Sequence, residues 1–130
     1  MGKALVLVAE RDADTRALLR YIVELGGFDV VTAADEPAAL AALTRDVPGI
    51  ILANLMLPPE DGIQFIRRVR ATPGFAETAI LALVNGRDSR EGAAEAGATE
   101  ILMKPDDIPQ LLETLNRLLP ARGAARASAD

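Results

Sequence analysis

Asn54 is the polar residue best placed for chemistry in this 130-residue chain. It ends the apolar run Ile50 to Ala53, which is too short for a helix and is typical of a strand buried on both faces of a parallel sheet. Ligands bind to such sheets outside the carboxyl ends of the strands. An amide nitrogen is not a nucleophile at neutral pH, and the amide oxygen carries no charge. Asn54 therefore indicates either a binding role or a structural one, in which the amide satisfies backbone groups at the strand end.

The rest of the chain alternates between strand and helix patterns. Strands are predicted over Ala4–Ala9, Phe28–Thr32, Ile50–Ala53, Thr78–Val84 and Thr99–Met103. Helices are predicted after them, with starts at Asp12 or Asp14, at Asp35, at Asp61, at Asp88 or Ser89, and near Asp107. The fourth helix is the weakest, because Gly92 costs about 1 kcal/mol relative to alanine. Five such units predict a doubly wound α/β domain with a parallel sheet.

Composition excludes several classes of function. The 19 acidic and 14 basic residues give a net charge of −5, which argues against generic binding to nucleic acid or to anionic membranes. The absence of cysteine and histidine removes disulfides, thiolate metal sites and the commonest general base. No signal peptide or membrane-spanning run is visible, so a cytoplasmic location is expected. Residues 1–120 are predicted to form one domain, and residues 121–130 a disordered tail or the start of a linker.

Four short motifs occur in the order and spacing of a known family. They are Ala9-Glu10-Arg11-Asp12 with Arg16, Leu55-Met56-Leu57-Pro58 with Asp61-Gly62, Gly97-Ala98, and Lys104-Pro105. With these motifs the chain resembles, from Lys3 to Leu119, the receiver domain of bacterial response regulators. The resemblance implies a flavodoxin-like fold with five parallel strands in the order 2-1-3-4-5 and five helices.

In a working receiver of this family, two acids after the first strand bind Mg²⁺, and the aspartate ending the third strand accepts a phosphoryl group. A lysine after the fifth strand contacts that group. The resemblance places Glu10 at the first acid, Arg11 at the second and Asn54 at the phosphoacceptor, while Lys104 and Pro105 keep the expected types. The chain therefore resembles a pseudo-receiver with a degenerate acidic pocket.

The positions that couple phosphorylation to the surface also depart from the family pattern. Val84 stands where threonine or serine is expected, and Ile101 stands where an aromatic residue is expected. A valine side chain cannot donate a hydrogen bond to a phosphoryl oxygen. Asp12 remains a candidate outer acid of the pocket.

Charge gives a physical measure of these departures. Glu10, Arg11, Asn54 and Lys104 sum to about +1, whereas a working site of the family holds about −2. A divalent ion about 4 Å from one unit charge feels roughly 8 kcal/mol at an effective dielectric constant near 20. Mg²⁺ binding is therefore expected to be lost or weak, and no cofactor is expected. Two local interpretations stay open: Arg11 can face solvent, and Lys104 can pair with Glu10 in place of the metal.

The expected function is a receiver-like module of two-component or phosphorelay signalling that is not an enzyme and acts through protein–protein contacts. The expected partner is a histidine kinase, an output domain, another signalling protein or a second copy, bound through the fourth helix, fifth strand and fifth helix. One alternative is a phosphoreceiver that uses Asp12 or Asp61 as acceptor. Another is a small-ligand or nucleotide-binding domain, although no glycine lies in the first turn, Glu10 to Thr15, to admit a phosphate.

Overall fold

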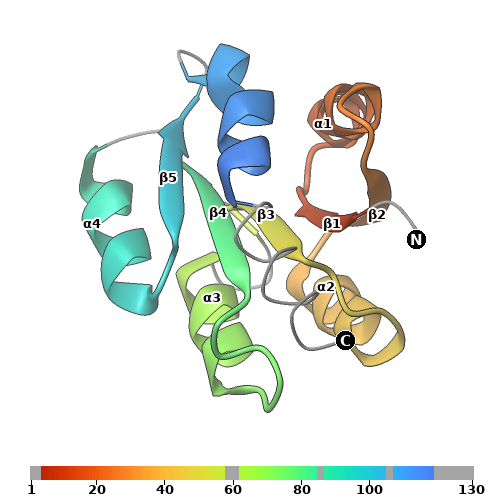
Figure 1. The fold of residues 1–130 in the computed structure, drawn as a ribbon. Helices are drawn as coiled ribbons and strands as arrows, with labels where there is room; N and C mark the ends of the chain where they lie inside the picture. Colours follow the sequence, from red (N-terminus) through yellow and green to blue (C-terminus); the bar gives the residue numbers. More distant parts are fainter. Residues whose placement is uncertain (1–3, 58–61, 85–86, 105–106, 119–130) are drawn as a thin grey trace.

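The computed structural model describes residues 4–57, 62–84, 87–104 and 107–118, and these form a five-stranded parallel sheet flanked by helices (Figure 1). The strands are β1 (Leu5–Ala9), β2 (Asp29–Ala33), β3 (Ile50–Asn54), β4 (Ala79–Val84) and β5 (Glu100–Met103). Their order is β2-β1-β3-β4-β5, with every neighbouring pair parallel. The predicted fold class and strand order are confirmed.

Helices connect the strands and follow the last one. They are α1 (Ala13–Leu25), α2 (Glu36–Arg45), α3 (Gly62–Ala71) and α4 (Arg87–Ala96), followed after β5 by the 3-10 turn η1 (Ile108–Gln110) and a final helix over residues 111–118. Two predicted starts differ from the structure. Since α4 begins at Arg87, Asp88 and Ser89 lie in its first turn. The last helix is preceded by a 3-10 turn, and the Asp107 carboxylate accepts a hydrogen bond from the Met103 amide instead of capping that turn.

Two predicted helix caps are present and fix how the chain leaves the sheet. The Asp12 side chain accepts a hydrogen bond from the Thr15 amide at the start of α1. The Asp35 side chain accepts one from the Ala38 amide at the start of α2. Each cap satisfies an amide that has no partner within the helix. Because both helices start directly after a strand, the caps place the connecting turns at the carboxyl edge of the sheet.

The sheet is buried on both faces, which explains its continuous apolar strands. On one face, β-strand residues such as Leu7 and Ile51 pack against α2, α3 and α4. On the other face, residues such as Val8 and Leu52 pack against α1 and the last helix, through Leu19 and other residues. Figure 1 shows the same division, with α1 and the blue last helix on one side of the sheet. In the part of the chain that the structure describes, no helix is long and apolar enough to cross a membrane.

Some sequence predictions concern residues outside the described ranges. These are the start of the third helix at Asp61, the motif residues Pro58 and Pro105, and the tail over residues 121–130 with its boundary at residue 120. They remain predictions.

Candidate functional site

Three polar side chains from three strand ends meet at the carboxyl edge of the sheet. Glu10 follows β1, Asn54 ends β3, and Lys104 follows β5. The Asn54 Nδ2 atom donates a hydrogen bond of 2.6 Å to Glu10 Oε1, and Lys104 Nζ lies 3.7 Å from the same oxygen. Glu10 and Asn54 are 1% and 5% exposed, so this contact is shielded from water. The expected ion pair between Lys104 and Glu10 is therefore present.

The strand register brings the first two residues together. Ala9 of β1 lies opposite Ala53 of β3, so the residues that follow them, Glu10 and Asn54, are neighbours across the edge. Gly62, at the start of α3, packs directly against this strand end. A Cβ atom at Gly62 would lie 2.6 Å from the Leu55 Cα atom and 2.7 Å from the Asn54 carbonyl oxygen. Glycine is therefore required there for α3 to approach the site.

The remaining polar atoms of the pair also have partners. Glu10 Oε2 accepts a hydrogen bond of 2.9 Å from the Asp12 amide. Asn54 Oδ1 accepts one of 2.9 Å from the Met56 amide. Asn54 thus fills the structural role expected of an amide at a strand end. It also supplies one of the hydrogen-bond donors that the buried Glu10 carboxylate requires.

Arg11 and Asp12 do not join the pocket. Both residues are exposed, and the structure therefore corrects the charge of about +1 that included Arg11. Of the three residues that follow β1, Glu10 is the one that is buried. Glu10, Asn54 and Lys104 alone sum to about zero, which is still about two charges more positive than a working site of the family. The side chain of Asp12 caps α1.

The Asp12 carboxylate is perturbed by its capping role. Hydrogen bonds from the amide and hydroxyl of Thr15, helped by the nearby charges of Arg11 and Arg16, hold the pKa of Asp12 below its ordinary value. The carboxylate is thereby committed to the helix start. Of the two alternative acceptors, Asp12 therefore lies at a helix start and not at the end of β3, and Asp61 lies outside the described residues.

The two switch-equivalent positions are packed into the core. Val84 is buried in the cluster that α2, α3 and α4 cover, and Ile101 is half-buried against the same cluster. The backbone amide of Lys104 donates a hydrogen bond of 2.8 Å to the Val84 carbonyl oxygen, which joins the end of β4 to the lysine. Neither apolar side chain offers a hydrogen bond to a phosphoryl group.

The residues present do not fit the Mg²⁺ ion that the resemblance implies. Mg²⁺ requires an octahedral set of oxygen ligands, usually including carboxylates. Among the described residues, the carboxylate that contacts both Asn54 and Lys104 is that of Glu10, and its Oε1 atom already receives an amide hydrogen and an ammonium charge. Among the residues that the structure describes, no group of three or more histidine, cysteine, aspartate or glutamate residues could hold a metal ion.

Some contacts made by arginine side chains could not be predicted from the sequence. Arg16 Nη1 donates a hydrogen bond of 2.9 Å to the Glu10 carbonyl oxygen, so α1 holds the turn that carries the buried glutamate. On the other side of the sheet, Glu36 of α2 pairs with Arg68 of α3. The presence of Arg16 after the acidic turn was visible in the sequence, but its target was not.

Comparison with known proteins identifies relatives of the whole domain. The model of the response regulator receiver domain family matches residues 6–116. The transcriptional regulatory protein PrrA of Mycobacterium tuberculosis is 32% identical over 125 residues, which cover 96% of this chain and 54% of that protein. The chain therefore spans about half the length of that relative. An uncharacterised 14.6 kDa protein of Leptolyngbya boryana is 33% identical over 114 residues, covering 86% of this chain and 87% of that protein.

Solved structures agree with these relatives. The chemotaxis protein CheY4 of Vibrio cholerae superposes with a TM-score of 0.83 at 28% identity, covering 90% of this chain and 99% of that one. A response regulator receiver protein of Pseudomonas putida superposes with a TM-score of 0.81 at 29% identity, covering 90% of this chain and 98% of that one.

Proposed function

Because the chain belongs to the family of response regulator receiver domains, which act in two-component signalling, we propose that it signals without being phosphorylated. In this proposal the domain is not an enzyme and needs no Mg²⁺. It acts through contacts with a protein partner, such as a histidine kinase or an output domain. PrrA is itself a transcriptional regulatory protein longer than this chain, which makes an output domain a reasonable partner.

One observation carries the proposal: the amide of Asn54 lies where the resemblance places the phosphoacceptor, and it donates its hydrogen bond to Glu10. An amide cannot attack phosphorus as a carboxylate does. Phosphoryl transfer also requires cations that neutralise the transferred oxygens. Here Lys104 and Asn54 already compensate the charge of Glu10, so the polar groups are satisfied in a single arrangement without metal or phosphate.

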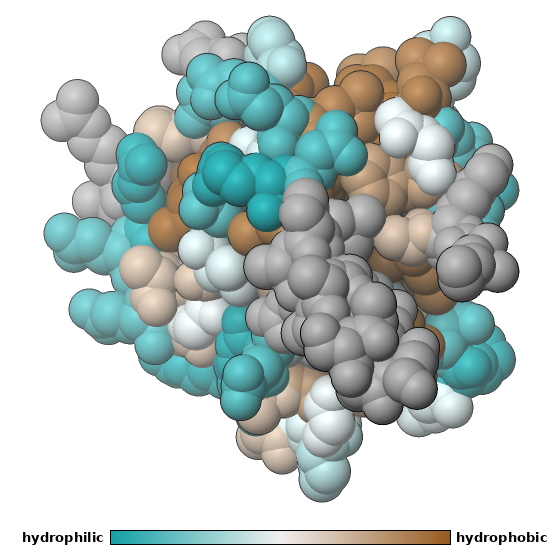
Figure 2. Space-filling view, in the orientation of Figure 1, coloured by the Kyte–Doolittle hydropathy of each residue, from teal (hydrophilic) through white to brown (hydrophobic). Residues whose placement is uncertain are grey.

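The surface best suited to a protein partner lies on α1. Leu18, Tyr21 and Leu25 are each more than half exposed and recur at i, i+3 and i+7, so they form one line along the helix, here termed the α1 stripe. In Figure 2 hydrophobic residues gather at the upper right, where Figure 1 places α1. Exposed apolar side chains in a contiguous row favour a protein contact.

The predicted face of α4, β5 and the last helix offers less apolar surface. Among the described residues of the last helix, Leu111 and Leu115 are buried and Leu112 and Leu118 are half-buried, so their side chains are largely used by the core. In addition, Arg117 Nη1 pairs with Glu100 Oε2 at 2.9 Å, which links the last helix to β5. We therefore assign the partner contact to the α1 stripe first and retain the other face as the competing assignment.

Affinity capture from the source cell tests this function. Immobilised wild-type protein is compared with Leu18→Glu and with Arg90→Glu, an exposed residue of α4, each with and without acetyl phosphate and Mg²⁺. The proposal predicts one partner whose capture is unchanged by acetyl phosphate, is lost with Leu18→Glu and is retained with Arg90→Glu. Arg45→Glu, at the exposed end of α2, serves as the control for a charge reversal elsewhere.

Two results would contradict the proposal in different ways. Capture that depends on acetyl phosphate would show that the domain responds to phosphorylation. Capture lost with Arg90→Glu and retained with Leu18→Glu would move the contact to α4 and β5, while the phosphorylation-independent function would stand.

A further inference from the structure

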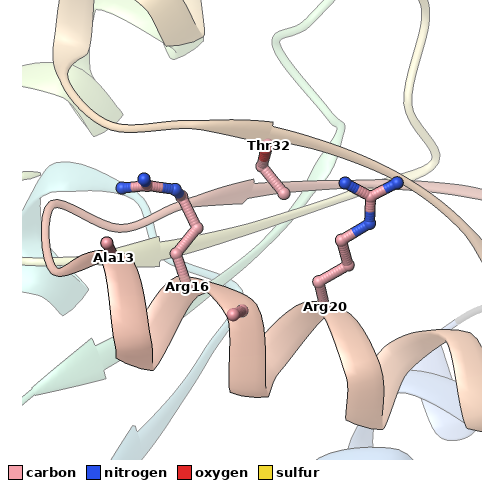
Figure 3. Close-up of a pocket in the computed structure, with 5 residues that line it drawn as sticks. Ala13, Arg16, Arg20 and Thr32 are labelled. Atoms are coloured by element: carbon pink, nitrogen blue, oxygen red, sulfur yellow. The ribbon is translucent and has the colours of Figure 1, made fainter.

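A small groove lies between α1 and β2, apart from the Glu10–Asn54 pair. It has a volume of about 190 Å³ and is lined by Ala13, Arg16, Ala17, Arg20 and Thr32. In Figure 3 the side chains of Arg16 and Arg20 project from α1 toward β2, with Thr32 between them on the facing strand. The two alanines leave room along the helix, so the groove combines open space with two permanent positive charges.

The two arginines have donors to spare. Arg16 uses Nη1 for the carbonyl oxygens of Glu10 and Arg11, at 2.9 and 3.3 Å. Arg20 uses Nε for the Glu24 carboxylate at 3.3 Å, an exposed pair. Within the described residues, no hydrogen bond engages Nη2 of Arg16 or either terminal nitrogen of Arg20. A guanidinium offers five N–H donors and no acceptor, so these spare donors suit an anion.

Like charges at this spacing repel. Arg16 and Arg20 are four residues apart on one face of α1, an arrangement that destabilises a helix when the two charges have the same sign. The carboxylate of Glu24 forms an ion pair with Arg20 and not with Arg16. An anion bound between the guanidinium groups would remove the repulsion. The half-buried Thr32 adds a hydroxyl that has no hydrogen-bond partner in the described part of the chain.

We propose that this groove binds a small phosphate-type dianion, through Arg16 and Arg20 with the Thr32 hydroxyl as a further donor. Paired guanidinium groups match the geometry and charge of phosphate oxygens better than those of a monoanion. The groove cannot enclose a larger ligand, because sites that enclose drug-sized molecules occupy about 300–1,000 Å³. A nucleotide base and sugar therefore cannot be enclosed, and the ligand is inorganic phosphate or a compact phosphomonoester. The site is independent of the proposed function, since it does not involve Asn54.

An anion bound in this groove would also affect the Glu10–Asn54 pair, through Arg16. Arg16 already holds the Glu10 carbonyl oxygen, and the Glu10 carboxylate accepts the Asn54 amide hydrogen. An anion that fixes the Arg16 guanidinium therefore fixes the turn after β1. We expect the backbone amides of Glu10 and Arg11 to report occupancy of the groove, together with those of Ala17, Arg20 and Thr32.

An NMR titration of the ¹⁵N-labelled full chain tests the site. Inorganic phosphate, phosphoserine and acetate are added separately at constant ionic strength. We expect saturable shifts at Ala17, Arg20 and Thr32 with a millimolar dissociation constant for phosphate, and binding of acetate at least about fivefold weaker. The tighter of inorganic phosphate and phosphoserine identifies the ligand as the free ion or as a monoester.

Three variants make the result specific. Arg20→Gln removes the charge and leaves a shorter polar side chain, whereas Thr32→Val keeps the shape of the side chain and removes the hydroxyl. Both should weaken phosphate binding, the first by about tenfold and the second by a few-fold. Arg45→Gln removes an exposed arginine of α2 and should leave the dissociation constant unchanged. Non-saturating shifts of equal size around Arg45, or a dissociation constant unchanged by Arg20→Gln, would overturn the proposal. The ¹⁵N spectra of the variants verify that each is folded.

Discussion

The side-chain amide of Asn54 donates a 2.6 Å hydrogen bond to Glu10 Oε1, joining two nearly buried residues that lie 44 positions apart in the chain. A buried carboxylate is costly unless it is hydrogen-bonded and its charge is compensated. Asn54 supplies one donor, the Asp12 amide supplies another, and Lys104 supplies the charge. These three groups together satisfy the hydrogen bonding and compensate the charge of the buried carboxylate.

Replacement of Asn54 by aspartate tests how far the amide stabilises Glu10. Asn54→Asp exchanges a donor for a second carboxylate beside Glu10 Oε1, while Lys104 offsets part of the repulsion. We expect the free energy of unfolding at neutral pH to fall by about 2–4 kcal/mol in the presence of a chelator. Urea denaturation followed by circular dichroism measures the change.

Mg²⁺ should recover part of this loss, because two adjacent carboxylates are oxygen ligands for a divalent cation. Asn54→Ala is the control: it also loses the donor to Glu10, and in addition the acceptor for the Met56 amide, but it adds no charge, so its stability should not depend on Mg²⁺. Equal stability of Asn54→Asp with chelator and with Mg²⁺ would show that the edge cannot accept a cation even when a second carboxylate is present.

Lys104 is expected to stabilise the fold through its pairing with Glu10. The lysine side chain is only 19% exposed, and Glu10 would remain buried and charged without it. Lys104→Met should therefore lower the free energy of unfolding by about 1–2 kcal/mol, less than for a fully buried pair because water still reaches the lysine. Glu24→Gln, which breaks the exposed pair with Arg20, should cost no more than about 0.5 kcal/mol. Equal effects of the two substitutions would contradict this assignment.

The capping carboxylate of Asp12 makes part of the stability depend on pH. Its pKa is lower in the folded protein than its ordinary value, chiefly because of the hydrogen bonds from Thr15, so the ionised form favours folding. The contribution is present above the ordinary pKa and is lost as the pH falls through the lowered one. Asp12→Asn keeps a capping acceptor but does not ionise. As the pH is lowered from about 5 to about 2, wild type loses this contribution and the variant does not. The urea midpoint of the variant should therefore rise relative to that of wild type. A constant difference would contradict the role of ionisation.

Arg70 should be the arginine of α3 that tolerates replacement least. Its guanidinium donates hydrogen bonds to the carbonyl oxygens of Gly97 at 2.7 Å, of Thr78 at 2.7 Å and of Phe75 at 3.2 Å, which ties the turn before β4 to the turn before β5. Lysine cannot reproduce this fork. Arg70→Lys should lower the free energy of unfolding by about 2–3 kcal/mol, whereas Arg67→Lys, at an exposed neighbour, should change it by less than about 0.5 kcal/mol. Similar values for both would contradict the assigned role.

The architecture could be predicted from the sequence because its determinants are local. Apolar runs such as Ile50 to Ala53 have only one stable placement, in the centre of a sheet, and the strands lie within one residue of their predicted ends. Asp12 and Asp35 cap their helices as their residue types suggest. The meeting of Glu10 with Lys104 follows from the family resemblance and the strand order.

The environment of single long side chains could not be predicted in the same way. The family resemblance places Arg11 at the second acid of the pocket, yet the structure shows that Arg11 is exposed. Arg16 and Arg70 bind backbone carbonyl oxygens, and every residue carries one, so no sequence pattern marks the target. The α1 stripe could not be predicted from the sequence either, because Leu18 and Leu25 have the same residue type as leucines of the core.

Intact-mass spectrometry after incubation with acetyl phosphate and Mg²⁺ tests most directly whether this receiver domain works without phosphorylation. A receiver that retains its acceptor aspartate is treated in parallel to show that the phosphodonor is active. Because Asn54 presents an amide and the charge of Glu10 is already compensated, we predict that the mass of this protein stays unchanged while that of the other receiver increases. A phosphorylated species of this protein that disappears on treatment with hydroxylamine would contradict the account.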